Sequence, residues 1–216
     1  MGYPVLLHLQ GRLVIVIGGG QVASRKIGDL LASGANILVI SPTVTDALKA
    51  LVERGALDWR EERYTLGTLQ IVRPFLVFAV SDLPEVNAQV VSEAQTLGLL
   101  VGAADREGDF ASMATVRRGV ITLAAATDGA SPALAAHLRE RLETVIGEEY
   151  GTLADWLAEL RPLVQQHIPT QAARRVLWQA IVASPALEHL RQGNAVAARE
   201  IVNQLLAEAG AQEALR

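Results

Sequence analysis

A glycine-rich turn near the start of the chain constrains the fold more than any other feature. Gly18-Gly19-Gly20 follows an apolar run at 13–17 and precedes a segment whose apolar residues recur at helical spacing. A short apolar run that stops at glycine is typical of a strand buried on both faces. A similar run lies at 37–40, so this part of the chain has the length of a strand–helix–strand unit with parallel strands.

The glycines in this turn have the spacing of a dinucleotide-binding motif. Gly18 permits the tight turn, Gly20 lets a pyrophosphate approach the backbone, and the small Ala23 allows the helix to pack closely on the sheet. The N–H groups and the dipole of the helix attract the anion. A merely structural turn is the alternative, but the position between strand and helix favours dinucleotide binding. The candidate cofactor-binding residues are Gly18, Gly20, Gln21, Val22 and Ala23 at the turn, Ser41, Pro42 and Thr43 after the second strand, and Ala79 and Ser81 after a later one.

The end of the second strand departs from the usual motif. An acidic residue normally stands there and binds the ribose 2′-hydroxyl of NAD. This chain has Ser41-Pro42-Thr43 instead, and no arginine stands beside them for the 2′-phosphate of NADP. Serine and threonine hydroxyls can still bind a ribose. This position therefore leaves the choice between NAD and NADP open.

The rest of the chain falls into two parts. Strands at 75–80 and 99–103, with helices between and before them, continue the alternation of a doubly wound parallel sheet. The pattern changes near residue 113: a strand at 120–125 precedes a helix that begins at Ser131-Pro132, and the chain from Tyr150 onward is helical.

Composition excludes several classes of function. Hydrophobic residues make up 50% of the chain, which permits a sizeable core, and the net charge of -4 argues against nucleic acid as a partner. The absence of cysteine excludes disulfides and thiolate-bound metals, and the four histidines lack ligand spacing, so we expect no permanent metal site. No apolar stretch approaches the ~18 residues that span a bilayer. No secretory pattern opens the chain, so we expect no membrane contact and a cytoplasmic protein.

Five blocks of sequence resemble, in order, the precorrin-2 dehydrogenase and sirohydrochlorin ferrochelatase family, which includes the N-terminal module of sirohaem synthase. The blocks are YPVLLHLQGRLVIVIGGGQVASRK (3–26), FAVSDLPEVN (78–87), VGAAD (101–105), DFASMATVRRG (109–119) and TDGASPALAAHLRERLE (127–143).

The resemblance implies an architecture and an activity. The fold would be a Rossmann-like, doubly wound parallel α/β domain that binds NAD (1–113), a small α+β dimerisation region (114–147) and a helical C-terminal domain (148–216). The activity would be NAD-dependent oxidation of precorrin-2 to sirohydrochlorin by a homodimer. Some members also insert ferrous iron, which is then a substrate.

The resemblance places the family's catalytic aspartate at Asp105, which follows a strand where doubly wound folds bind ligands. Its expected role is that of a general base, and a turn or capping residue is the alternative. Arg117 and Arg118 are candidate contacts for substrate carboxylates, although a solvated surface is the usual role of such residues. Ser131 is first a helix cap and second a substrate contact. His137 is a further substrate candidate, with surface packing as its alternative.

Three questions stay open at this point. A bifunctional dehydrogenase–ferrochelatase would use the same aspartate as the dehydrogenase alone. A NAD-sensing regulatory module would keep the glycine turn, but it would not be expected to carry the SPALAAHLRERLE helix. The apolar stripe from Leu134 to Val145 is either a dimer interface or part of an internal core.

Overall fold

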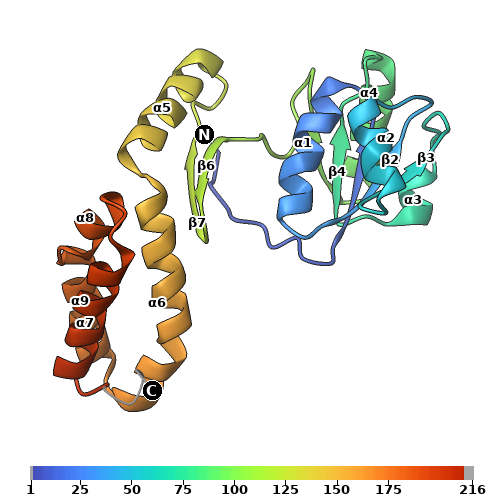
Figure 1. Ribbon diagram of the computed structural model, residues 1–216. Coiled ribbons are helices and arrows are strands. Elements are labelled where there is room, and N and C mark those ends of the chain that lie inside the picture. Colours follow the sequence, from blue (N-terminus) through green and yellow to red (C-terminus); the bar gives the residue numbers. More distant parts are fainter. Residues whose placement is uncertain (1, 212–216) are drawn as a thin grey trace. The chain divides into compact units, whose positions relative to one another are not determined.

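A computed structural model describes residues 2–211, and the chain divides into two compact units between Ser112 and Met113 (Figure 1). The first unit contains a five-stranded parallel sheet in the order β3-β2-β1-β4-β5. This order reverses direction at β1, which confirms the predicted doubly wound, Rossmann-like sheet. The strands are β1 (Leu13–Ile17), β2 (Asn36–Ile40), β3 (Asp58–Arg60), β4 (Leu76–Ala79) and β5 (Leu100–Ala103).

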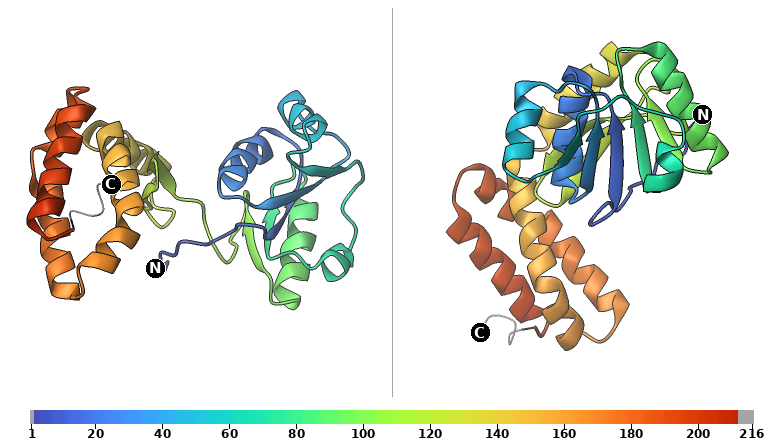
Figure 2. Two further views of the ribbon diagram at one scale, coloured as in Figure 1. Left: turned by 60° about the horizontal axis from the view of Figure 1, so that its bottom comes forward. Right: turned by 90° about the vertical axis from the view of Figure 1, so that its right-hand side faces the viewer.

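Helices cover both faces of this sheet, as the two further views show (Figure 2). Side chains alternate along a strand, so Val14 and Val16 of β1 face one way and Ile15 and Ile17 the other. The first pair packs with α1 (Gln21–Ala32) and α2 (Asp46–Glu53). The second pair packs with α3 (Thr68–Val72) and α4 (Pro84–Thr96). Burial on both faces explains why these strands are continuous apolar runs.

The second unit begins with an antiparallel hairpin and continues as helices. The sequence predicted only the later strand of the hairpin. The core of the unit lies among α6 to α9, around residues such as Leu160, Ile181 and Leu206. The elements are β6 (Ala114–Arg118), β7 (Ile121–Ala125), α5 (Pro132–Val145), α6 (Glu148–His167), α7 (Gln171–Ala183), α8 (Ala186–Arg191) and α9 (Ala195–Glu208).

Helix α5 contributes no buried residue to this core. Leu134, Leu138 and Val145 are 49%, 39% and 61% exposed. The apolar stripe of α5 is therefore not an internal core of the chain. The division of the second unit into a dimerisation region (114–147) and a helical domain (148–216) stays a prediction. Across residues 2–211, no helix is both long and apolar enough to cross a membrane.

Candidate functional site

The carboxyl ends of the parallel strands bring the predicted site residues of the first unit to one edge of the sheet. Gly18 follows β1, Ser41 follows β2, Ser81 lies just beyond β4, and Asp105 lies just beyond β5. Strands β1 and β4 are neighbours at the point where the sheet reverses direction. Open α/β sheets bind their ligands in the crevice at this point.

The glycine turn brings the backbone close to its neighbours on one side and leaves open space on the other. Gly18 has φ +119°, and a Cβ atom there would lie 2.6 Å from the carbonyl oxygen of Val80. A Cβ on Gly19 would lie 2.2 Å from the carbonyl oxygen of Thr43. A Cβ on Gly20 would meet no atom within 4 Å. The first two glycines thus permit the packing of the turn, while Gly20 leaves room for a ligand.

The amino end of α1 fits an anionic group. Gly20 is the N-cap, no side chain accepts from the first-turn N–H groups, and the turn contains no acidic residue. Gln21 and Val22 are exposed there, while Ala23 is fully buried against the sheet. The helix dipole and the first-turn N–H groups are thus available to a pyrophosphate.

The predicted ribose contacts after β2 differ in accessibility. Ser41 is buried, its N–H donates to the carbonyl of Arg60 (3.3 Å), and its carbonyl accepts from the Trp59 indole N–H (2.9 Å). Pro42 and Thr43 are exposed. Of this group, Thr43 therefore offers the more accessible hydroxyl.

The residues at the end of β4 and just beyond it connect the neighbouring segments of the sheet edge. Ala79 is fully buried and its carbonyl accepts from Ala104 N–H (3.1 Å), so its backbone joins β4 to the segment after β5. Ser81 is half-buried, and its Oγ accepts from Leu83 N–H (3.0 Å).

Asn87 on α4 is a site residue that sequence reasoning missed. It is 1% exposed, and its Oδ1 accepts from Ser81 N–H (2.9 Å). Its Nδ2 donates to the Ser81 carbonyl (2.9 Å) and to Asp105 Oδ1 (3.1 Å). This one amide therefore joins the end of β4 to the predicted catalytic carboxylate. The available signal was its place at the end of the block FAVSDLPEVN.

Asp105 is accessible and ionised. Its side chain is 30% exposed, and Arg106 lies 3.3 Å from its Oδ2. The hydrogen bond from Arg106 is the main cause that holds the pKa of Asp105 below its ordinary value, and the Asn87 amide adds to this effect. A carboxylate in this state can accept a proton from a ligand.

Packing behind β5 fixes the loop that carries Asp105. A Cβ on Gly102 would lie 2.7 Å from the ring of Phe110, so glycine at this position permits Phe110 to pack there. That ring meets Phe78 edge to face, at 5.2 Å between centroids. Lys26 Nζ lies 5.1 Å from the Phe78 ring centroid and donates to Ser112 Oγ (2.8 Å). Burial lowers the pKa of Lys26.

The remaining candidates belong to the second unit. Arg117 and His137 are exposed. Ser131 caps α5, because its Oγ accepts from Leu134 N–H (3.1 Å). No contact joins these three side chains to one another, and their role as substrate contacts stays a prediction. Among residues 2–211 no cluster of three or more His, Cys, Asp or Glu is arranged to hold a metal ion.

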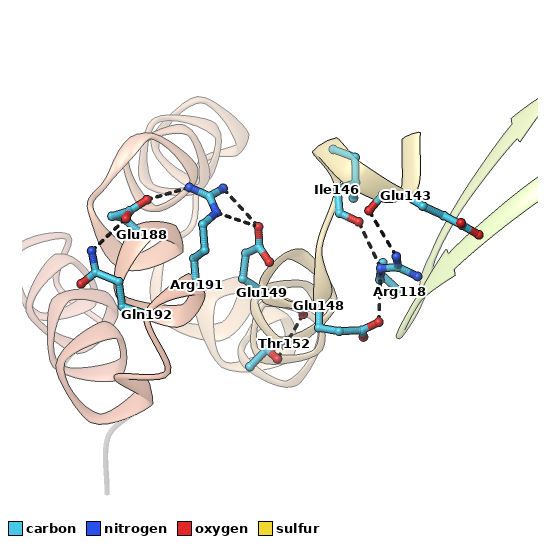
Figure 3. A network of polar contacts seen from close by, with 9 residues as sticks. All are labelled: Arg118, Glu143, Ile146, Glu148, Glu149, Thr152, Glu188, Arg191 and Gln192. Carbon is cyan, nitrogen blue, oxygen red and sulfur yellow. Dashed lines mark hydrogen bonds and ion pairs between the residues drawn. The ribbon is translucent and has the colours of Figure 1, made fainter. Parts of the chain in front are cut away.

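The contacts of Arg118 are structural (Figure 3). Its guanidinium donates to the carbonyls of Ile146 (3.0 Å) and Glu143 (3.5 Å) and lies 3.2 Å from Glu148 Oε1. It thereby ties the β6–β7 hairpin to the junction of α5 and α6. A substrate carboxylate would have to compete with these acceptors.

Comparisons with known proteins find related sequences for both parts of the chain. Residues 5–114 match a family described as putative NAD(P)-binding, and residues 149–206 match the sirohaem synthase dimerisation region. The chain is 34% identical to a sirohaem synthase of Chromobacterium violaceum over 98% of its length, and 36% identical to one of Methylococcus capsulatus over 97%. It spans 45% and 44% of those two relatives.

A solved structure resembles nearly the whole chain. The structure of SirC, a precorrin-2 dehydrogenase, matches with a TM-score of 0.78 and 28% identity, covering 94% of this chain and 98% of that one. The match includes both the nucleotide-binding unit and the helical part. The chain therefore belongs to the family of NAD(P)-binding proteins that contains the precorrin-2 dehydrogenases and the sirohaem synthases.

Proposed function

We propose that this chain oxidises precorrin-2 to sirohydrochlorin with NAD as the hydride acceptor. The observation that carries the proposal is the position of Asp105, an ionised and accessible carboxylate at the same sheet edge as the glycine turn. The precorrin-2 dehydrogenase SirC has the same fold over nearly all of its length. That neighbour supplies the substrate class, and the geometry of this chain supports the chemistry.

The reaction removes one hydride and one proton from the substrate. The open space at Gly20 and the uncapped amino end of α1 fit the pyrophosphate of a dinucleotide. When bound, the dinucleotide supplies the hydride acceptor. Asp105 accepts the proton through its carboxylate and then releases it to water. Asn87 holds that carboxylate at the sheet edge.

The choice of NAD over NADP is part of the proposal. The 2′-phosphate of NADP normally requires an arginine near the end of the second strand. The segment Ser41-Pro42-Thr43 contains none, and Arg60 on the neighbouring strand lies 3.9 Å from Glu62. The exposed Thr43 is the proposed partner of the ribose hydroxyl.

We also propose that the chain acts as a homodimer. The exposed stripe of α5, with Leu134, Leu138 and Val145, is an apolar surface suited to a second copy. Arg117, Ser131 and His137 are the proposed substrate contacts of the second unit. Arg118 is the weakest of the predicted contacts, because backbone carbonyls already occupy its donors.

An anaerobic assay tests the function directly. Precorrin-2 is mixed with the protein and NAD, and the appearance of NADH and of the sirohydrochlorin spectrum is followed. Asp105→Asn should abolish turnover and leave NAD binding intact, because it removes the proton acceptor and keeps the shape. Parallel runs use NADP, and then sirohydrochlorin with ferrous iron as substrates for the chelatase alternative. Absence of NADH formation by the wild-type protein would refute the dehydrogenase.

A further inference from the structure

Arg106 donates hydrogen bonds to both oxygens of the proposed catalytic carboxylate of Asp105. Its Nε donates to Asp105 Oδ1 (3.4 Å) and its Nη2 to Asp105 Oδ2 (3.3 Å). The same Nη2 donates to the carbonyl of Pro84 at the start of α4 (2.6 Å). The guanidinium is therefore held at two points, one on Asp105 and one on the backbone of α4.

These contacts weaken Asp105 as a general base in the free protein. Oδ1 also accepts from Asn87 Nδ2 at 3.1 Å, so each oxygen of Asp105 already has a partner. A base needs a free lone pair directed at the proton that it removes. A cation on the carboxylate also lowers its affinity for a proton. Asp105 is thus well placed for catalysis, but its contact with Arg106 lowers its affinity for a proton in this state.

Arg106 itself is open to a ligand. Its side chain is 31% exposed, and Nη1 contacts no acceptor within residues 2–211. The guanidinium fork binds carboxylates in a bidentate geometry. Precorrin-2 carries several carboxylates, so a substrate group that reaches Arg106 can replace Asp105 as its partner.

We propose that Arg106 is a substrate-responsive positioning residue, which holds Asp105 in the free protein and releases it when a carboxylate of the tetrapyrrole binds the guanidinium. The proposal rests on the proposed function. Among the described residues, Arg106 is the charged group that contacts Asp105, and α4 contributes the neutral Asn87 amide and the Pro84 carbonyl to the two side chains. The lowered pKa of Asp105 agrees with this arrangement, because its first cause is the bond from Arg106.

The pH dependence of turnover tests the proposal. The profile of kcat/KM reports ionisations of the free protein, and that of kcat reports those of the substrate complex. Both are measured with precorrin-2 and NAD for the wild type, Arg106→Gln and Arg106→Lys. Arg54→Gln is the matched control, because Arg54 is an exposed arginine of the same unit that donates to a carbonyl within its own helix region. Thermal unfolding and NAD binding show whether each variant is folded.

In the wild type and in Arg54→Gln, the acidic limb of kcat should lie at higher pH than that of kcat/KM, since substrate binding frees Asp105 from the cation. In Arg106→Gln the acidic limbs of kcat and kcat/KM should lie at the same pH. The KM for precorrin-2 should rise about tenfold, because a charge-assisted contact with the substrate is lost. In Arg106→Lys, which keeps the charge without the fork, the limbs should be separated by less than in the wild type.

Two results would overturn the proposal. Coincident limbs in an active wild type would show that substrate does not release Asp105. A lower kcat with unchanged KM in a folded Arg106→Gln variant would show that turnover requires the contact between Arg106 and Asp105. An inactive wild type would refute the proposed function instead, so the two failures are distinguishable.

Discussion

Substitutions at two glycines of the turn should distinguish its role in folding from its role in cofactor binding. Gly18→Ala adds a methyl group 2.6 Å from the Val80 carbonyl oxygen, at a residue with φ +119°. That backbone conformation costs a non-glycine residue roughly 1–3 kcal/mol, and the clash adds about as much again. We expect the free energy of unfolding to fall by about 3 kcal/mol or more. In a unit of this size, each kcal/mol of lost stability lowers Tm by roughly 4 °C. A loss of about 3 kcal/mol therefore lowers Tm by about 12 °C.

Gly20→Ala should leave the stability nearly unchanged and weaken NAD binding. Gly20 has φ -83° and nothing within 4 Å of an added Cβ, so the folded backbone accepts alanine. The poorer N-cap and the stiffer unfolded chain offset each other, which leaves Tm within about 3 °C of the wild type. The methyl group enters the space proposed for the pyrophosphate, so NAD affinity should fall at least about tenfold.

Calorimetry without cofactor and titration with NAD measure the two effects separately. The reasoning predicts a large stability loss only in Gly18→Ala and a selective affinity loss in Gly20→Ala. An unchanged Tm for Gly18→Ala would refute the steric argument. Wild-type NAD affinity in Gly20→Ala would refute the position of the cofactor.

The remaining predictions concern three side chains. Asn87→Ala leaves the half-buried N–H and carbonyl of Ser81 without their partner, so stability should fall by about 2–3 kcal/mol in chemical denaturation. The kcat should fall with it, because Asp105 loses a positioning bond. Burial and the bond to Glu93 raise the pKa of Tyr64, so the folded state keeps the phenol neutral where the unfolded chain ionises. Wild-type stability should therefore fall as pH rises above about 10, and less so in Tyr64→Phe, which urea denaturation at several pH values measures. Arg118→Ala should lower the stability of the second unit by roughly 1–3 kcal/mol with NAD binding unchanged; wild-type stability with a raised KM for precorrin-2 would instead make Arg118 a substrate contact.

Those parts of the site that depend on local pattern could be predicted from the sequence. The apolar runs of β1 and β2 and the glycines between them identify the dinucleotide turn, because strand, turn and helix N-terminus are neighbours in the chain. The cap at Ser131 is equally local, since its partner is Leu134.

Features held by distant partners could not be predicted. Helix α3 has five residues, and the N–H groups of its second and third residues, Leu69 and Gln70, donate to the Glu93 carboxylate on α4. The first strand of the hairpin has only Val116 buried, so it lacks a clear alternation of apolar residues. The role of Asn87 depends on Asp105, which lies 18 residues further along the chain. In each case the determining contact becomes visible only after the chain has folded.

The outer edge of β5 is protected against pairing with a strand of another protein molecule. Asp109 N–H donates to the carbonyl of Val101 (2.7 Å), and its carboxylate accepts from Val101 N–H (2.9 Å). Asp109 thus satisfies the N–H and the carbonyl of Val101, which a sixth strand would otherwise bind. At the opposite side, β3 has only three residues and carries the charged Asp58 and Arg60. Unpaired strand edges promote aggregation, so the short loop after β5 protects the sheet against extension into intermolecular β-structure.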